Sequence, residues 1–372
     1  MRSFGPTIFA EMSALALETD SVNLGQGFPD TDGPPQLLEA AVRAIRTGHN
    51  QYPPGPGTAP LRRAIAAHQH RHYAMDFDAD TEVLVTAGAT EAIAAAVLAL
   101  TDVGDEVMIF EPYYDSYAAS IALAGAQRRT VTLRRVAQTW QFDVAELAAA
   151  ITPRTRVVLL NTPHNPTGKV FTRAELDAVA RLAQEHDLIV ISDEVYEHLT
   201  FDGHVHVPIS TLPGMRERTV TIGSAGKTFS VTGWKIGWVC APAPLLSAVR
   251  TVKQFLTYVN GGPFQPAVAE ALDAESYAGL AAQLESQRDQ LCDGLQGMGF
   301  DVIRPQATYF ATVDVHRDAV AFCRELPHRA GVVAIPSSAF YDSPAGDSLV
   351  RLAFCKQPGV LDEALRRLKE MS

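Results

Sequence analysis

Short apolar runs alternate along this chain with longer segments in which apolar residues recur at helical spacing. Most of the short runs are almost continuously apolar, which is typical of strands that are covered on both faces of a sheet. The predicted strands are Val83–Thr86, Val107–Phe110, Arg129–Leu133, Val157–Asn161, Leu188–Ser192, Thr219–Gly223 and Gly237–Ala241. Because these runs alternate with helical segments, the pattern predicts an α/β fold built on a mostly parallel sheet.

Proline and capping residues mark where several of the helical segments begin. An amphipathic segment over residues 37–45 follows a pair of prolines, which favour the first turn of a helix. Thr172 and Glu175 have the spacing of a capping box, so a helix is predicted to begin directly after Thr172.

The pattern changes near residue 270. A long helix, three more strand candidates and a closing helix, Leu361–Met371, follow in order. They predict a smaller α+β domain made of residues 1–45 and 271–372, beside a large domain of residues 46–270 that holds the seven-stranded sheet. We expect the N-terminal segment to fold back onto the smaller domain. The length of 372 residues is sufficient for two domains.

Charge and composition exclude several classes of partner. The net charge is −11 and the isoelectric point is near 5.5, which argues against nucleic acid or an anionic membrane as the main partner. No apolar run approaches the roughly 20 residues that span a bilayer, and the N-terminus lacks the apolar region of a signal peptide. The four cysteines lie far apart and have apolar neighbours, so we expect reduced, buried thiols in a cytoplasmic protein.

The histidines do not suggest a metal centre. His68, His70 and His72 alternate along a charged segment. Residues at a spacing of two do not share a helix face, so we expect no metal site.

The most informative stretch is Ser224–Trp238, which contains Lys227 directly after the apolar run Thr219–Gly223. A lysine is costly to bury unless its amine has a specific task. One such task is a Schiff base with a carbonyl cofactor, and the neighbouring residues suit pyridoxal phosphate. Once released, the same amine can act as a general base at the substrate α-carbon. Lys235 is the weaker competitor for this role.

Three consecutive predicted strands end in polar residues, namely Asn165, Asp193 and Lys227 with their neighbours. Ligands bind outside the carboxyl ends of strands in open parallel sheets, so these segments should converge on one site. A carboxylate at Asp193 would keep the pyridine nitrogen protonated, so that the ring accepts electrons. Asn165 and Tyr196 would donate to the phenolate oxygen of the ring, and Tyr114 offers a flat face for stacking.

Two further groups complete the expected site. The turn at residues 86–91 opens a helix whose free N–H groups suit a phosphate. The phosphate donors expected there are the backbone of Ala89 and Thr90 and the side chains of Thr90, Ser224 and Lys235. Arg351 lies inside an apolar strand pattern, where a charge needs an anionic partner, and its guanidinium matches a substrate carboxylate.

Each of these residues also has an ordinary structural explanation when it is considered alone. A lysine near a strand end is usually solvated, and Asn165-Pro166-Thr167-Gly168 is by itself a turn. Asp193 alone fits a helix start, and Arg351 alone fits half of a structural ion pair. The hypothesis depends on all of them arriving in order at one edge of the sheet.

The motifs resemble those of the class I/II aminotransferases of fold type I. The resemblance rests on Asn165–Gly168, Asp193–Tyr196 and the signature S-x-x-K-x-x-x-x-x-G-x-[KR]-x-G around Lys227. It implies pyridoxal phosphate as cofactor, Lys227, Asp193 and Tyr196 as catalytic residues, and a homodimer. It also implies that the Gly27 backbone binds the substrate carboxylate beside Asn165 and Arg351, and that Tyr52 reaches the phosphate of the other subunit.

Within this family, three hypotheses on activity stand together. The N-terminal segment and Pro263–Pro266 look most like N-succinyldiaminopimelate aminotransferases, which implies transfer of an amino group from N-succinyl-LL-diaminopimelate to 2-oxoglutarate in lysine biosynthesis. Asn23–Asp30 and Gly223–Trp238 look like the kynurenine/glutamine and methionine aminotransferases, which implies methionine, glutamine or aromatic substrates. A cysteine-conjugate β-lyase would use the same lysine and aspartate. A non-enzymatic regulator is disfavoured, because no basic helix-turn-helix pattern precedes Asn23.

Overall fold

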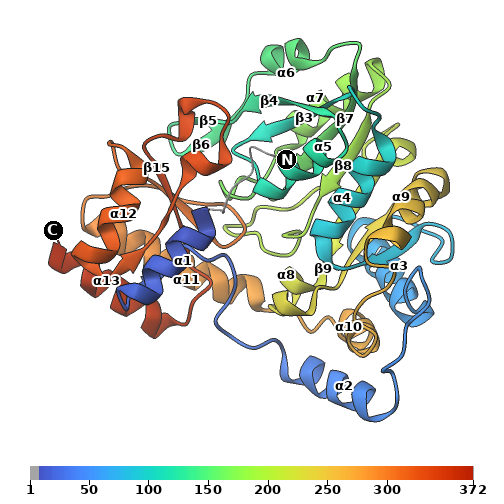
Figure 1. Ribbon diagram of the computed structural model, residues 1–372, viewed down its shortest axis with the longest axis horizontal. Coiled ribbons are helices and arrows are strands. Elements are labelled where there is room, and N and C mark those ends of the chain that lie inside the picture. The colour runs from blue at the N-terminus through green and yellow to red at the C-terminus, as the bar shows by residue number, and fades with distance from the viewer. Residues whose placement is uncertain (1–7, 372) are drawn as a thin grey trace.

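The computed structural model of the protein describes residues 8–371 (Figure 1). Its largest element is a seven-stranded sheet with the order β2-β10-β9-β8-β7-β3-β4. The strands are β2 (Val83–Thr86), β3 (Glu106–Glu111), β4 (Gln127–Thr132), β7 (Thr155–Asn161), β8 (Ile189–Asp193), β9 (Thr219–Ser224) and β10 (Gly237–Cys240). The seven strands predicted before residue 270 are therefore present in one sheet, and the mostly parallel architecture is confirmed.

The exception to the parallel arrangement is β10, which is antiparallel to both of its neighbours. Its first residue, Gly237, is the register partner of Thr86 at the end of β2 and of Ser224 at the end of β9. The start of β10 consequently lies at the same edge of the sheet as the carboxyl ends of the other strands.

Both faces of the large sheet are buried, which explains the continuous apolar runs. Val107 and Ile109 of β3 pack in one cluster with residues of the helices α4 and α5, while Met108 and Phe110 pack in another with α7. The helices around this sheet are α3 (Ala59–Tyr73), α4 (Gly88–Leu100), α5 (Asp115–Leu123), α6 (Val144–Ala150), α7 (Arg173–Glu185), α8 (Ala225–Thr228), α9 (Ala243–Leu256) and α10 (Phe264–Asp273).

Helix α7 begins as predicted. The hydroxyl of Thr172 accepts a hydrogen bond from the Glu175 backbone N–H, and the Glu175 carboxylate accepts one from the Thr172 N–H. The capping box is complete. It fixes the end of the loop that leads from β7, past Asn165, into α7.

A second, smaller sheet has the strand order β11-β12-β15-β14. It lies on the side of the molecule where the red and orange elements are drawn in Figure 1. Its pairings are all antiparallel. The elements of this part are β11 (Asp301–Ile303), β12 (Phe310–Asp314), β13 (Val332–Val333), β14 (Ile335–Pro336), β15 (Leu349–Ala353), α11 (Leu280–Gly297), α12 (Ala319–Ala330) and α13 (Pro358–Met371). A small hairpin, β5 (Arg134–Val136) with β6 (Thr139–Gln141), extends from the large sheet.

The N-terminal segment divides between the two parts. Helix α1 (Ile8–Glu18) lies among the C-terminal elements in Figure 1, and β1 (Val22–Asn23) pairs in parallel with β13. Helix α2 (Pro35–Arg46) instead packs in a cluster with residues of α3 and α10. The expected fold-back thus applies to α1 and β1. The proposed domain boundary at residues 45/46 stays a prediction, and residues 1–7 of that segment lie outside the described residues.

Among the helices of residues 8–371, none combines the length and the apolar character that crossing a bilayer requires.

Candidate active site

A cavity of about 310 Å³ lies where β7, β8 and β9 end. Every residue of the predicted site except Tyr52 lines it. These residues are Gly27, Ala89, Thr90, Tyr114, Asn165, Asp193, Tyr196, Ser224, Lys227, Lys235 and Arg351. The convergence inferred from the strand ends is therefore a geometric fact of the fold.

Lys227 lies on α8, the single helical turn that follows β9. Its amine donates a hydrogen bond of 2.6 Å to the hydroxyl of Tyr309, which in turn donates to the Gly27 carbonyl at 2.8 Å. Burial lowers the pKa of Lys227 to about 8, because the charged ammonium loses hydration. A substantial share of this amine is therefore neutral near physiological pH, as a nucleophile or a base requires.

Asp193 ends β8 and is buried. The Tyr117 hydroxyl donates to its Oδ2 at 2.6 Å. Burial raises the pKa of Asp193 to about 6, and the hydrogen bond from Tyr117 acts in the opposite direction. Within residues 8–371 this carboxylate has no ion-pair partner at salt-bridge distance, so it is poised to pair with a cationic group in the cavity.

Asn161, at the end of β7, makes hydrogen bonds with the backbone of two predicted site residues. Its Nδ2 donates to the Asp193 carbonyl at 2.9 Å, and its Oδ1 accepts from the Asn165 backbone N–H at 2.7 Å. Tyr196 is buried beside Tyr309, with 5.2 Å between the ring centroids. These contacts fix the polar side chains of β7 and β8 relative to each other.

The N-terminus of α4 forms an anion-binding corner. No side chain caps this helix, so the first N–H groups at Ala89 and Thr90 are open to a ligand. A Cβ on Gly88 would lie 3.3 Å from the Lys235 amine, which places that cation at the same helix end. A Cβ on Gly237 would lie only 2.6 Å from the Gly88 backbone, so glycine is needed for this close approach.

Arg351 is the most unusual side chain of the site. It is buried in β15, where Nη1 donates to Asn165 Oδ1 at 3.3 Å and Nη2 donates to the Gly25 carbonyl at 3.1 Å. Its Nε has no hydrogen-bond partner, and no carboxylate pairs with it anywhere in the described part of the chain. Its guanidinium carbon lies 4.0 Å from the centroid of the Phe310 ring. Burial lowers its pKa to about 10, which still leaves it charged at neutral pH.

Such an arginine is suited to a visiting carboxylate, because the ligand would restore the missing ion pair. The alternative role considered above, half of a structural ion pair, finds no partner among residues 8–371.

Tyr52 is the predicted site residue that does not line the cavity of its own chain. It is 81% exposed and stacks edge-on against Tyr258, away from the cavity of its own chain.

Sequence reasoning missed three residues that hold the site in place: Tyr117, Asn161 and Tyr309. Asn161 and Tyr117 stand close in sequence to predicted site residues, so their positions, at the end of a strand and in the first turn of a helix, were a usable signal. Tyr309 is 82 residues from Lys227, and nothing in the local pattern links the two.

A partly buried amine, a buried carboxylate and a buried arginine without an ion-pair partner among residues 8–371 surround one cavity, and together they define a site for amino-acid chemistry on an α/β scaffold. The family model for "Aminotransferase class I and II" matches residues 19–368. The structure resembles that of N-succinyldiaminopimelate aminotransferase from Mycobacterium tuberculosis, with a TM-score of 0.98 and 54% identity over 100% of this chain and 98% of the other.

Two further relatives extend the comparison. The methionine aminotransferase of Escherichia coli is 42% identical over 99% of this chain and 96% of its own length. The kynurenine–oxoglutarate transaminase of Dictyostelium discoideum is 37% identical over 97% of this chain and 93% of its own length.

The chain belongs to the class I and II aminotransferases. It is an enzyme that transfers amino groups, and its architecture is that of the fold type I aminotransferases.

Proposed function

We propose that the enzyme uses pyridoxal 5'-phosphate and transfers the amino group of N-succinyl-LL-diaminopimelate to 2-oxoglutarate. Three features of the chain fit this cofactor. The uncapped start of α4 beside Lys235 suits its phosphate, the buried Asp193 suits its ring nitrogen, and the partly buried amine of Lys227 suits its carbonyl. Ser224, Thr90 and Ala89 would add phosphate contacts, and Tyr114 would stack on the ring.

When bound, pyridoxal phosphate supplies a carbonyl that accepts the amino group and a ring that accepts electrons. The chain's own residues would do the rest. Asp193 would hold a proton at the ring nitrogen, and Asn165 and Tyr196 would donate to the ring oxygen. Lys227 would carry a proton to and from the substrate α-carbon, because its lowered pKa leaves the amine free to accept one.

The single observation that carries the substrate class is Arg351, a buried guanidinium whose Nε is unpaired. The lysines that line the same cavity, Lys227 and Lys235, are assigned to the cofactor, so Arg351 is left for the substrate α-carboxylate. The Gly27 backbone and Asn165 lie beside it on the cavity wall. The choice of N-succinyl-LL-diaminopimelate, and with it a place in lysine biosynthesis, is supported by the similarity to the enzyme of Mycobacterium tuberculosis.

A second candidate is transfer from methionine, glutamine or an aromatic amino acid. The observation in its favour is the aromatic lining of the cavity by Phe9, Phe28 and Phe310, which suits an apolar substrate side chain. The methionine and kynurenine transaminases among the relatives support it as well.

Single additions of amino donors to the purified holoenzyme, without an acceptor, separate these candidates. We expect glutamate and N-succinyl-LL-diaminopimelate to remove the visible absorption of the cofactor, because each would pass its amino group to it. Methionine and kynurenine should leave the absorption nearly unchanged. The reverse pattern would support the second candidate, an enzyme for methionine, glutamine or aromatic amino acids. Release of pyruvate from a cysteine conjugate in the absence of an acceptor would indicate a β-lyase. If adding pyridoxal phosphate to the protein produced no visible absorption band of a bound cofactor, the cofactor proposal would be wrong.

We also propose that the enzyme works as a homodimer whose sites are completed across the interface. Four large apolar side chains, Tyr52, Phe255, Leu256 and Tyr258, are exposed by 81%, 83%, 46% and 54%. Such an apolar cluster is typical of a surface that a partner covers. Tyr52 belongs to it and lies outside its own cavity, as expected for a side chain that reaches the phosphate in the other subunit.

Tyr52→Phe should weaken the binding of pyridoxal phosphate about tenfold, because a hydrogen bond to a charged group contributes about 1.5–3 kcal/mol. The affinity is measured by fluorescence titration of the apoenzyme. Tyr258→Phe is the matched control, since this exposed neighbour packs against Tyr52 without an assigned contact to the cofactor. Equal affinities of both variants, or a monomer in sedimentation velocity, would contradict the proposal.

A cytoplasmic location is proposed on chemical grounds. Cys240, Cys292, Cys323 and Cys355 are all buried and unpaired with each other. Free thiols of this kind suit a reducing compartment.

A further inference from the structure

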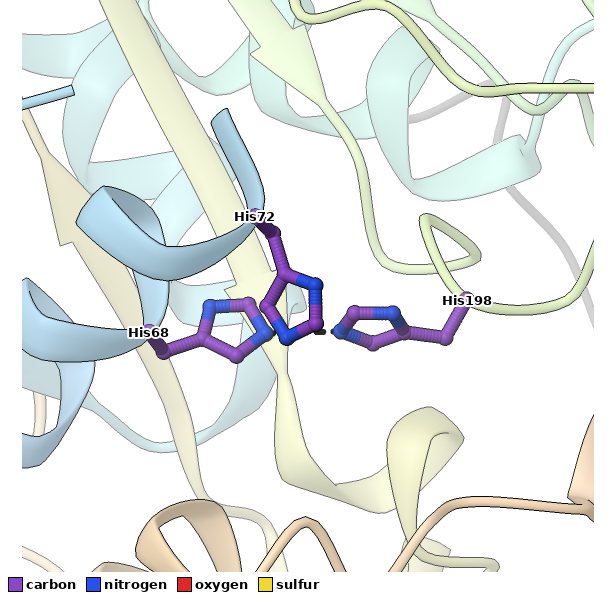
Figure 2. Close-up of side chains that lie close together, drawn as sticks. All are labelled: His68, His72 and His198. Atoms are coloured by element: carbon purple, nitrogen blue, oxygen red, sulfur yellow. Dashed lines mark hydrogen bonds between the residues drawn. The ribbon is translucent and has the colours of Figure 1, made fainter. Parts of the chain in front are cut away.

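Three histidines outside the active site face one another. Figure 2 shows the rings of His68 and His72, from α3, and the ring of His198, from the segment after β8, converging on one point. One ring nitrogen of each lies within 4.8 Å of the others. The spacing argument of the sequence analysis applies to His70, but His68 and His72 are four residues apart and share a face of α3.

Two of the three rings are already in contact through their nitrogens. Nε2 of His68 lies 2.7 Å from Nε2 of His198. Neutral imidazole nitrogen is the ligand that zinc and similar ions prefer.

Gln69 is placed to support His68 as a metal ligand once its side-chain amide is turned. Nε2 of Gln69 lies 3.4 Å from Nδ1 of His68, while Oε1 of Gln69 is buried without a partner. A half-turn of this amide would place Oε1 at Nδ1 of His68, which would then carry a proton and leave Nε2 as a ligand. The Tyr277 hydroxyl lies 2.6 Å from Nε2 of His72.

We propose that His68, His72 and His198 bind one divalent late transition-metal ion, with zinc as the reference ion, and that water or the Tyr277 hydroxyl completes a tetrahedral site. For the closest pair of ligand atoms, those of His68 and His198, the geometry needs only a small change. Zinc–nitrogen bonds of about 2.0–2.1 Å place two tetrahedral ligands about 3.4 Å apart, so His68 and His198 would separate by less than about 1 Å. His72 is exposed, which gives the ion a path from solvent.

The site would connect α3 to the segment that carries the catalytic groups. His198 stands two residues beyond Tyr196, on the chain that leaves β8 after Asp193. A bound ion would hold this segment against α3, and the stability of the folded enzyme would rise with the logarithm of the ion concentration above its Kd.

The test is zinc binding to the untagged holoenzyme after chelator treatment, measured by calorimetry in the absence of amino acids. We expect one ion per chain, and at least about tenfold weaker binding in His72→Gln and His198→Gln, since each removes one ligand. His70→Gln is the matched control on the same helix and should bind zinc as the wild type does.

A second control addresses the other group of metal-binding residues, Asp301, Asp314 and His316. His316→Gln should leave zinc affinity unchanged, and all variants should hold equal amounts of pyridoxal phosphate. Zinc should raise the unfolding temperature of the wild type and of His70→Gln, but not of His72→Gln, whose exposed position lets the variant fold. No binding to the wild type, or equal binding in the His72 and His198 variants, would overturn the proposal.

Discussion

Replacing Lys227 with alanine is expected to lower the rate of transamination by about 10⁴-fold or more. The variant loses the amine that general acid–base catalysis needs, which alone contributes about 10²–10⁴-fold, together with the nucleophile that captures the cofactor. The measurement is single-turnover transfer from glutamate, followed at the visible absorption of the cofactor.

The loss should not come from unfolding. Among residues 8–371, Lys227 makes one side-chain hydrogen bond, to Tyr309, and we expect Tyr309 to keep its contact with the Gly27 carbonyl in the variant. We therefore expect a folded dimer that binds pyridoxal phosphate without a covalent bond. Lys369→Ala, at an exposed lysine of α13, is the control and should keep full activity. Full activity of Lys227→Ala would show that the site has been assigned to the wrong lysine.

Arg351→Ala is expected to lower kcat/KM by about 10²–10³-fold, mostly through KM. Truncating one partner of a buried charge pair costs about 2–5 kcal/mol, and each 1.4 kcal/mol is tenfold. Arg351→Lys keeps the charge but loses the planar fork, so it should recover only part of the affinity. Binding of the amino acid and of a dicarboxylate inhibitor is measured by titration of the holoenzyme.

A second buried arginine provides a matched control. Arg288 is also buried, but it is paired with Asp202 and Asp289. Arg288→Lys should therefore lower the unfolding temperature and leave KM unchanged. If Arg351→Ala binds carboxylate substrates as well as the wild type, the anchor for the carboxylate lies elsewhere.

Much of the large sheet could be predicted because its strands are buried on both faces. Val83–Thr86 is predicted and observed with the same ends, and β9 and β10 differ from prediction by one residue. The convergence of Asp193 and Lys227 also follows from the sequence, because the carboxyl ends of parallel strands share one edge.

The contacts that the sequence does not predict are those between segments far apart along the chain. Tyr309 reaches Lys227 across 82 residues, and His198 meets His68 across 130. Periodicity indicates which face of an element is buried but not which distant residue covers it. The position of α2 beside α10 is of the same kind, since its amphipathic face is evident and its partner is not.

The reversed direction of β10 limits where insertions and deletions can be tolerated in this chain. Residues 225–236 are anchored at both ends, at Ser224 and at Gly237, which are register partners in adjacent strands. Both lysines of the cavity, Lys227 and Lys235, stand within this short bridge. An inserted or deleted codon there would move one amine relative to the other, whereas the β5–β6 hairpin could lengthen without disturbing either. Among homologous enzymes, we therefore expect length differences in the β5–β6 hairpin and a constant length in the segment that corresponds to residues 225–236.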